Sequence, residues 1–128
     1  MKKTLVLVLL VAVLLAVCAA PAGAKSWKKV KELSGSGNND STYFALKGGT
    51  QKLTWKLTAD SPEAADMLFS AVYVMKKGTT LEDDGGIPAV MPDEEGTGSA
   101  KLHIKRGTYY LAMRAANCSW KLALYEWR

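Results

Sequence analysis

The segment that decides the fold is residues 51–58, whose sequence QKLTWKLT alternates polar and apolar side chains without a break. Successive side chains of a β-strand point to opposite faces, so Leu53, Trp55 and Leu57 share one face and the polar residues share the other. A strand with this pattern packs one face on a core and exposes the other to water. The segment therefore predicts a sheet that is covered on one side.

The same alternation returns near the carboxyl end in three segments, residues 101–105, 108–114 and 119–126. We therefore expect Trp55, Tyr109 and Trp120 to face the interior. Turn-forming residues at Gly107 and Asn117 separate these segments. Connections this short leave no room for a crossover helix, so we expect three consecutive antiparallel strands joined as hairpins.

The upstream half of the chain predicts two shorter strands, at residues 27–33 and 42–46. A polar loop at residues 34–40 is expected between them. Residues 67–75 are apolar on both faces, which is typical of a central strand covered on two sides. A helix competes there, because Ser61 and Pro62 resemble a helix start, and we expect one helical turn before Asp66.

Seven or eight short strands in about 100 residues indicate an all-β fold, namely an antiparallel β-sandwich with the jelly roll as a candidate topology. The segment from Thr79 to Gly98 is rich in Gly, Pro and Asp and is longer than most loops in compact domains. A closed barrel would need more regular strand lengths, so this loop argues against one. Loops of this length often carry function.

Residues 1–24 have the three parts of a secretory signal peptide. Met1–Lys3 is basic, Leu5–Val17 is an apolar run of 13 residues, and Ala22–Ala24 supplies small residues for cleavage. This run is shorter than the roughly 20 residues that a membrane-spanning helix needs. The short basic leader is typical of bacteria, so we expect a signal helix that is removed on export. Residues 25–128 then form the β-sandwich domain, secreted or periplasmic.

The two cysteines leave a second interpretation of the leader open. Leu15–Cys18 resembles the bacterial lipobox, in which the cysteine is lipidated, although Val17 departs from the usual small residue. Lipidation of Cys18 would make the protein a membrane-anchored lipoprotein. Without the leader, Cys118 is the only thiol, so no internal disulfide can form and we expect Cys118 to be buried.

Composition argues against nucleic acid and against catalysis. The 104 residues after the leader include 15 basic and 12 acidic ones, and a net charge of +3 is too weak to indicate nucleic-acid binding. His103 is the only histidine, and the chain has no nucleophile elbow and no zinc-binding helix motif. We therefore expect a protein that is not an enzyme.

Six acidic residues lie in the long loop without any lysine or arginine between them: Glu82, Asp83, Asp84, Asp93, Glu94 and Glu95. Calcium takes roughly six to eight oxygen ligands, which closely placed carboxylates and carbonyls supply. Two interpretations stay open, a solvated acidic loop without a cofactor and a calcium site. The calcium ligands would be Asp83, Asp84, Asp93, Glu94 and Glu95.

Four tryptophans and five tyrosines follow the leader, and most of them are expected in the core. Alternation leaves Tyr110, Tyr125 and Trp127 pointing outward. Sugar rings stack on exposed aromatic faces, so these three residues form the candidate binding face. Four lysines near the leader fit either a basic arm for anionic polymers or lipid, or a solvated first strand: Lys25, Lys28, Lys29 and Lys31.

The closing strands resemble a known family. Gly107–Met113, GTYYLAM, followed after a turn by Ser119–Leu124, SWKLAL, is similar to the last strands of bacterial pre-peptidase C-terminal domains. Upstream residues occur in an order consistent with that family: Phe44, Leu53–Leu57, Asp66 and Phe69–Tyr73. The resemblance covers about residues 41–126 and implies a noncatalytic β-sandwich appended to exported proteins, here without a peptidase. The family's usual Asp-Leu-Tyr stretch is not matched cleanly, so calcium binding is not carried over to Asp66.

Together these features predict an exported, noncatalytic binding or structural module of the bacterial envelope or extracellular space, with a protein or a polysaccharide as partner. The alternative is a small secreted inhibitor or hydrolase whose site the sequence does not reveal. A flat exposed aromatic face favours binding, whereas paired carboxylates, or Cys118 beside His103, in a deep cleft favour an enzyme.

Overall fold

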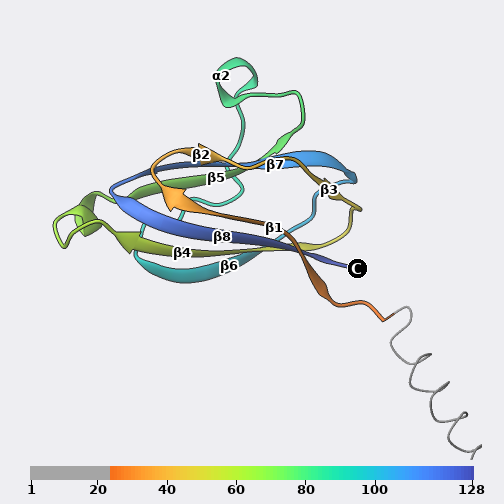
Figure 1. Cartoon of the computed structure of the whole chain (residues 1–128), viewed down its shortest axis with the longest axis horizontal. Helices are drawn as coiled ribbons and strands as arrows, with labels where there is room; N and C mark the ends of the chain where they lie inside the picture. The colour runs from red at the N-terminus through yellow and green to blue at the C-terminus, as the bar shows by residue number, and fades with distance from the viewer. Residues whose placement is uncertain (1–23) are drawn as a thin grey trace, which may run out of the picture.

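Two antiparallel sheets stack face to face in the computed structural model, which describes residues 24–128 (Figure 1). Sheet A contains, in spatial order, β1 (Trp27–Ser36), β8 (Cys118–Trp127), β4 (Gln51–Ala59) and β6 (Gly96–Leu102). Sheet B has β7 (Gly107–Ala116) at its centre, with β5 (Phe69–Lys76) on one edge and both β2 (Asn39–Asp40) and β3 (Phe44–Leu46) on the other. The all-β antiparallel sandwich predicted from the sequence is confirmed.

The strand order is that of a jelly roll. β2 and β3 pair with separate parts of β7, so they act as one strand interrupted at residues 41–43. On the other edge of β5, Val72 forms an isolated bridge with Val90, where a jelly roll has a further strand. With β2 and β3 counted as one strand, every connection except the one from β5 to Val90 leads from one sheet to the other. This is the connectivity of the two Greek keys of a jelly roll.

The leader lies outside this description. The expected signal peptide at residues 1–24 includes only Ala24 of the described residues, and Cys18 is not among them. Within residues 24–128, no helix is long and apolar enough to cross a membrane. The α-helix found there, α2 (Leu81–Asp84), has four residues.

Alternate residues of the strands fill the space between the sheets, as the sequence predicts. Leu53, Leu111 and Leu122 are completely buried, and Tyr109 and Trp120 lie in the same apolar cluster. Trp55 packs against this cluster while remaining half-buried. Cys118 is a buried free thiol, which confirms the expectation for it. Removal of this apolar surface from water is the dominant stabilising effect in such a core.

β6 begins before the position that the sequence predicts. The alternation indicates a strand at residues 101–105, but β6 spans Gly96–Leu102, so the predicted bounds are wrong. Small residues in its first half are typical of loops. A Cβ atom on Gly98 would lie 2.4 Å from the Trp55 ring, so this position has room only for glycine beneath the ring. Gly98 therefore makes space for a large neighbour.

The strands near the carboxyl end do not form the expected hairpins. β6 and β8 belong to sheet A, whereas β7, which lies between them in the chain, belongs to sheet B. Asn117, with a positive φ of 66°, makes the tight turn that carries the chain from one sheet to the other. The prediction of consecutive paired strands is wrong, because a short connection limits the distance between strand ends without requiring the strands to pair.

The strand predicted to be central lies at an edge of its sheet. β5 pairs with β7 on one side and makes only the Val72–Val90 bridge on the other. Its residues are nevertheless buried on both faces, including Ser70 and Ala71, because the segment after β5 folds back over sheet B. Apolar residues on both faces of a strand therefore indicate that both faces are covered, and they do not indicate that the strand lies at the centre of its sheet.

Two local predictions need smaller corrections. β1 continues through Ser36, into the loop expected at residues 34–40, because its pairing with β8 extends that far. The expected helical turn is the 3₁₀ turn η1 (Ala64–Met67), which extends past Asp66. The Ser61 hydroxyl accepts a hydrogen bond from the first N–H of this turn at 3.1 Å, in agreement with a helix start there.

Candidate binding face

The outer face of sheet A is open. Among residues 24–128, no segment crosses this face (Figure 1). The side chains of the face come from alternate positions of four strands. Directly opposed residues of antiparallel strands point to the same side of a sheet. The register therefore arranges these side chains in rows that run across the strands.

Four such rows follow one another from the end where β8 terminates. The first row is Trp27 and Trp127. The second row is Lys29, Tyr125, Lys52 and Lys101. The third row is Glu32, Ala123, Thr54 and Ser99. The fourth row is Ser34, Lys121, Lys56 and Thr97. We call the lysines and aromatics of these rows the basic face: Trp27, Lys29, Lys52, Lys56, Lys101, Lys121, Tyr125 and Trp127.

The aromatic end of the basic face is built around one lysine. The rings of Trp27 and Trp127 meet edge to face with their centroids 5.3 Å apart. The Lys52 ammonium lies 4.8 Å from the Trp27 ring centroid and 5.3 Å from the Tyr125 ring centroid. Trp127 remains 44 % exposed. It therefore presents an aromatic surface to solvent at the margin of the face.

A shallow depression of about 510 Å³ lies in the middle of the basic face, and we call it the trough. Short side chains of the third row, including Thr54, Ser99 and Ala123, form its floor. Longer side chains from the rows on either side form its walls: Lys29, Tyr125, Lys56 and Lys121. The hollow arises from side-chain length on a regular sheet, so no loop is needed to shape it.

Positive charge is concentrated on the basic face. Its rows contain five lysines and one carboxylate, Glu32, which leaves four net positive charges. Glu32 lies 3.1 Å from Lys29 and 4.0 Å from Lys121. Its hydrogen bond and negative charge raise the pKa of Lys29. Within the described part of the chain, Lys52, Lys56 and Lys101 form no ion pair.

A buried carboxylate holds the end of β8 that carries the outer aromatics. Glu126 is completely buried and accepts hydrogen bonds at 2.8 Å from the Gln51 side chain, the Lys47 N–H and Arg128 Nε. Burial alone raises the pKa of the Glu126 carboxyl, but these donors and the Arg128 charge bring that pKa below its ordinary value. Glu126 is therefore ionised at neutral pH and ties the strand end to the turn before β4.

The outer face of sheet B is covered. A second apolar cluster, separate from the core between the sheets, lies on this face and consists of Met75, Tyr110 and Ala112, with Tyr73 and Leu81 packed against them. The segment that contains α2 lies over this sheet in Figure 1. Tyr110 is only 8 % exposed, so the prediction that it belongs to an exposed binding face is wrong. Alternation points Tyr110 outward, but the long loop covers it.

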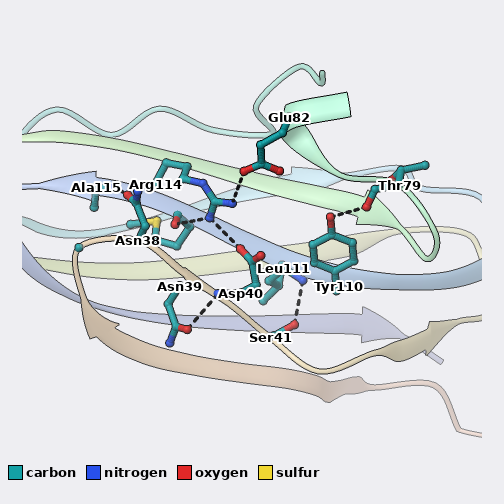
Figure 2. Close-up of polar contacts among 12 residues, drawn as sticks. Asn38, Asn39, Asp40, Ser41, Thr79, Glu82, Tyr110, Leu111, Arg114 and Ala115 are labelled. Carbon is teal, nitrogen blue, oxygen red and sulfur yellow. Dashed lines mark hydrogen bonds and ion pairs between the residues drawn. The ribbon is translucent and has the colours of Figure 1, made fainter. Parts of the chain in front are cut away.

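Polar contacts fix the covering segment to β7, as Figure 2 shows. The Tyr110 hydroxyl donates a hydrogen bond to the Thr79 carbonyl at 2.6 Å. Arg114 lies 2.7 Å from a carboxylate oxygen of Asp40 and 3.9 Å from one of Glu82. Burial, and then the Asp40 and Glu82 charges, raise the pKa of Tyr110, which keeps its hydroxyl a donor. Arg114 thus joins β2, β7 and α2.

Side chains also explain why β2 is so short. The Asn38 side-chain oxygen accepts a hydrogen bond from the Ala115 N–H at 3.1 Å, and the Ser41 hydroxyl accepts one from the Leu111 N–H at 2.8 Å (Figure 2). These side chains take the place of a partner strand's carbonyls at both ends of β2. The edge of β7 is therefore satisfied on either side of a two-residue strand.

The acidic residues of the long loop include two that bond to backbone. Asp84 accepts a hydrogen bond from the Thr80 N–H at 2.9 Å, and Glu95 accepts one from the Ala59 N–H at 2.6 Å. In the part of the chain that the structure describes, no three His, Cys, Asp or Glu side chains form a group suited to a metal ion. The calcium site stays a prediction for Asp83, Asp84, Asp93, Glu94 and Glu95.

Cys118 and His103 lie at opposite ends of sheet A. Cys118 is opposite Ala59, where β4 ends, whereas the His103 ring is 3.5 Å from the hydroxyl of Thr50, just before β4 begins. Burial, followed by the charge of Asp60, raises the pKa of the Cys118 thiol. The structure therefore does not bring these residues together as a nucleophile and a base.

The structure brings together two of the three residues predicted for binding. Tyr125 and Trp127 share the aromatic end of the basic face, whereas Tyr110 is on the other sheet. Sequence reasoning missed Trp27 and four of the five lysines, and it named Lys29 only as part of a basic arm or a solvated first strand. The alternation does predict that Lys52, Lys56 and Lys121 point outward from their strands, but the sequence does not reveal that these strands are neighbours.

Comparison with known proteins adds no family assignment. No family model matches the chain, and no curated protein matches it significantly. The resemblance of the closing strands to pre-peptidase C-terminal domains therefore stays a prediction.

Proposed function

We propose that this protein is an exported, noncatalytic β-sandwich module that binds a polysaccharide of the bacterial envelope or extracellular space through the basic face. The observation that carries the proposal is the aromatic end beside an open polar trough. Aromatic rings such as Trp127 offer apolar contact to the face of a sugar ring. The hydroxyls of Thr54 and Ser99 on the floor of the trough are suited to hydrogen bonds with sugar hydroxyls.

The composition of the face favours a polysaccharide over a protein partner. The centre of a protein interface is typically apolar and poor in lysine, with polar groups at its rim. The basic face has the reverse arrangement, because lysines and short polar side chains occupy its middle and the aromatics lie at one margin. A hydrated linear polymer suits such a surface better than a folded protein does.

The same face offers little for catalysis. Hydrolysis of a glycosidic bond ordinarily needs two carboxyl groups placed on either side of the bond. Among the described residues, a single carboxylate lines the trough, Glu32, and it is engaged by Lys29 and Lys121. Binding without turnover is therefore the function that these residues support.

A glycan-binding screen on the exported protein, with and without calcium, tests this proposal. Trp127→Ala is expected to weaken binding about fivefold, since the loss of one stacking contact is worth on the order of 1 kcal/mol. The matched control is Tyr43→Ala, because Tyr43 is also exposed, at 55 %, but lies outside the basic face. Equal losses in both variants would contradict the assignment of the face.

The same screen tests the alternatives. Capture of an envelope protein without any glycan binding would replace the polysaccharide with a protein partner. New reducing ends in a bound glycan would indicate a hydrolase. Binding that requires calcium would support the calcium site in the long loop, and calcium-independent binding would remove it from this function.

A further inference from the structure

Two pairs of lysines on the basic face oppose each other directly. Lys52 is opposite Lys101 of β6, and Lys56 is opposite Lys121 of β8. Like charges at directly opposed positions destabilise a sheet, and outward positions accept many uncharged residues. The repulsion within each of these two pairs works against the fold of sheet A. Their arrangement is therefore better explained by a ligand than by stability.

These pairs stand on both sides of the trough. Lys52 and Lys56 are four residues apart on β4, which separates their backbones by about 13 Å. Lys29 belongs to the same row as Lys52, and Lys121 belongs to the same row as Lys56. A chain that follows the trough across the strands would thus have ammonium groups along both of its sides.

The charge of the long loop is opposite to that of the basic face. Glu82, Asp83 and Asp84 belong to α2, which lies over the outer face of sheet B (Figure 1). The acidic side chains of α2 therefore lie on the side of the sandwich away from the basic face. An anionic polymer would be attracted to sheet A and repelled from α2, which fixes the face on which it binds.

We infer that the ligand is an anionic polysaccharide, which lies in the trough across the strands with its acidic groups against the lysines of the two rows and a sugar ring against Tyr125 in the wall of the trough. This inference rests on the proposed function and adds the charge of the ligand to it. The shared chemistry is a sugar chain with a negative group on its repeating unit. Exposed ion pairs are weakened by salt, so the affinity must fall as ionic strength rises.

The test uses two forms of one polymer, polygalacturonate and its fully methyl-esterified form, which has the same backbone without charge. Binding of each to the exported protein is measured by titration calorimetry at low and high salt. We expect tight binding of polygalacturonate and at least about tenfold weaker binding of the neutral ester. The double variant Lys56→Gln/Lys121→Gln should weaken polygalacturonate binding about tenfold and leave the binding of the ester unchanged.

The matched control is Lys76→Gln/Lys105→Gln, which removes the same charge from exposed positions outside the basic face. It should leave polygalacturonate binding unchanged, and a loss equal to that of the other double variant would overturn the inference. Equal affinity for the two polymers, with loss only in Trp127→Ala, would also overturn it while leaving the proposed function intact. Binding of neither polymer nor any other glycan would refute the proposed function as well.

Two further ligands distinguish other sources of negative charge. Vesicles of an anionic phospholipid and a short DNA duplex are titrated under the same conditions. Tighter binding of either one than of polygalacturonate, with the same dependence on Lys56 and Lys121, would overturn the assignment to a polysaccharide. Weaker binding of both supports it, because a linear sugar chain matches the trough and the Tyr125 ring in its wall.

Discussion

The outer faces of the two sheets have the same alternating sequence pattern but differ in their exposure to solvent. In both sheets alternation sends every second residue outward, and aromatic residues lie among them, Tyr110 on β7 and Tyr125 on β8. The long loop covers the outer face of sheet B and buries Tyr110. No described segment covers sheet A, so Tyr125 stays half-buried beside Lys52. An outward-pointing residue therefore stays on an open surface only where no described segment packs on it.

Replacement of Tyr110 tests the covered side of this comparison and has the largest expected effect. Tyr110→Ala removes a buried ring, so we expect a loss of about 3–5 kcal/mol in the free energy of unfolding, measured by denaturant titration. Tyr125→Ala is the control on the open side, and it should cost much less stability while weakening glycan binding. Similar stability losses in the two variants would contradict the difference between the faces.

Glu126→Gln tests whether the buried carboxylate supports the open side. The variant weakens four charge-assisted hydrogen bonds, so we expect a loss of about 1–3 kcal/mol at pH 7. Because the folded-state pKa of Glu126 is lowered, its contribution is present above the unfolded-state pKa of about 4.3 and is lost as the pH falls through the folded-state value.

The stabilities of wild type and Glu126→Gln should therefore converge in acid. Thermal unfolding followed from neutral pH down to strongly acidic pH gives the two curves. A constant difference over the whole range would show that the ionisation of Glu126 does not contribute.

Arg114→Gln tests the attachment of the covering loop. We expect a loss of about 1 kcal/mol, because the contacts of the guanidinium to Asp40 and Glu82 are only partly buried. Release of the loop should also speed proteolysis between residues 79 and 95, as measured by the rate at which a nonspecific protease cuts there. Arg106→Gln is the control, since Arg106 is exposed and forms no ion pair among the described residues. Equal cleavage rates in both variants would argue against a role for Arg114 in holding the loop.

Lys101→Gln has the smallest expected effect, and its sign is unusual. Removal of one charge from the Lys52–Lys101 pair should raise the free energy of unfolding by about 0.2–1 kcal/mol while weakening the binding of polygalacturonate. Lys105→Gln should change neither quantity. A stability loss in Lys101→Gln would mean that the lysine serves the sheet itself, and that a ligand is not needed to explain the opposed lysines.

Local alternation was sufficient to predict most of the strands and their inward faces. Leu53, Leu111 and Trp120 are buried as their phase requires, since the side-chain direction of a strand depends only on the neighbouring residues. The start of β6 was missed because Gly98 has the composition of a loop, and its reason, the ring of Trp55, comes from another strand. Glu126 was missed as a buried group, although it is in phase with Leu124.

The candidate site was predictable only in part for the same reason. Tyr125 and Trp127 follow from the phase of β8 alone. Trp27 and Lys101 join them through strands that are distant in the sequence and adjacent in the sheet. Tyr110 has the correct phase, but its exposure depends on a loop whose path the alternation does not describe.

The sequence by itself determined that this chain forms half-buried strands, which side of each strand faces the core, and which residues point outward. These properties follow from the two-residue period of extended backbone and from the free energy of burying apolar side chains. Tertiary structure alone decided which strands are neighbours, and so which lysines stand in rows and which outward face is covered. Strand pairing and loop packing join residues far apart in the chain, and no local pattern encodes them.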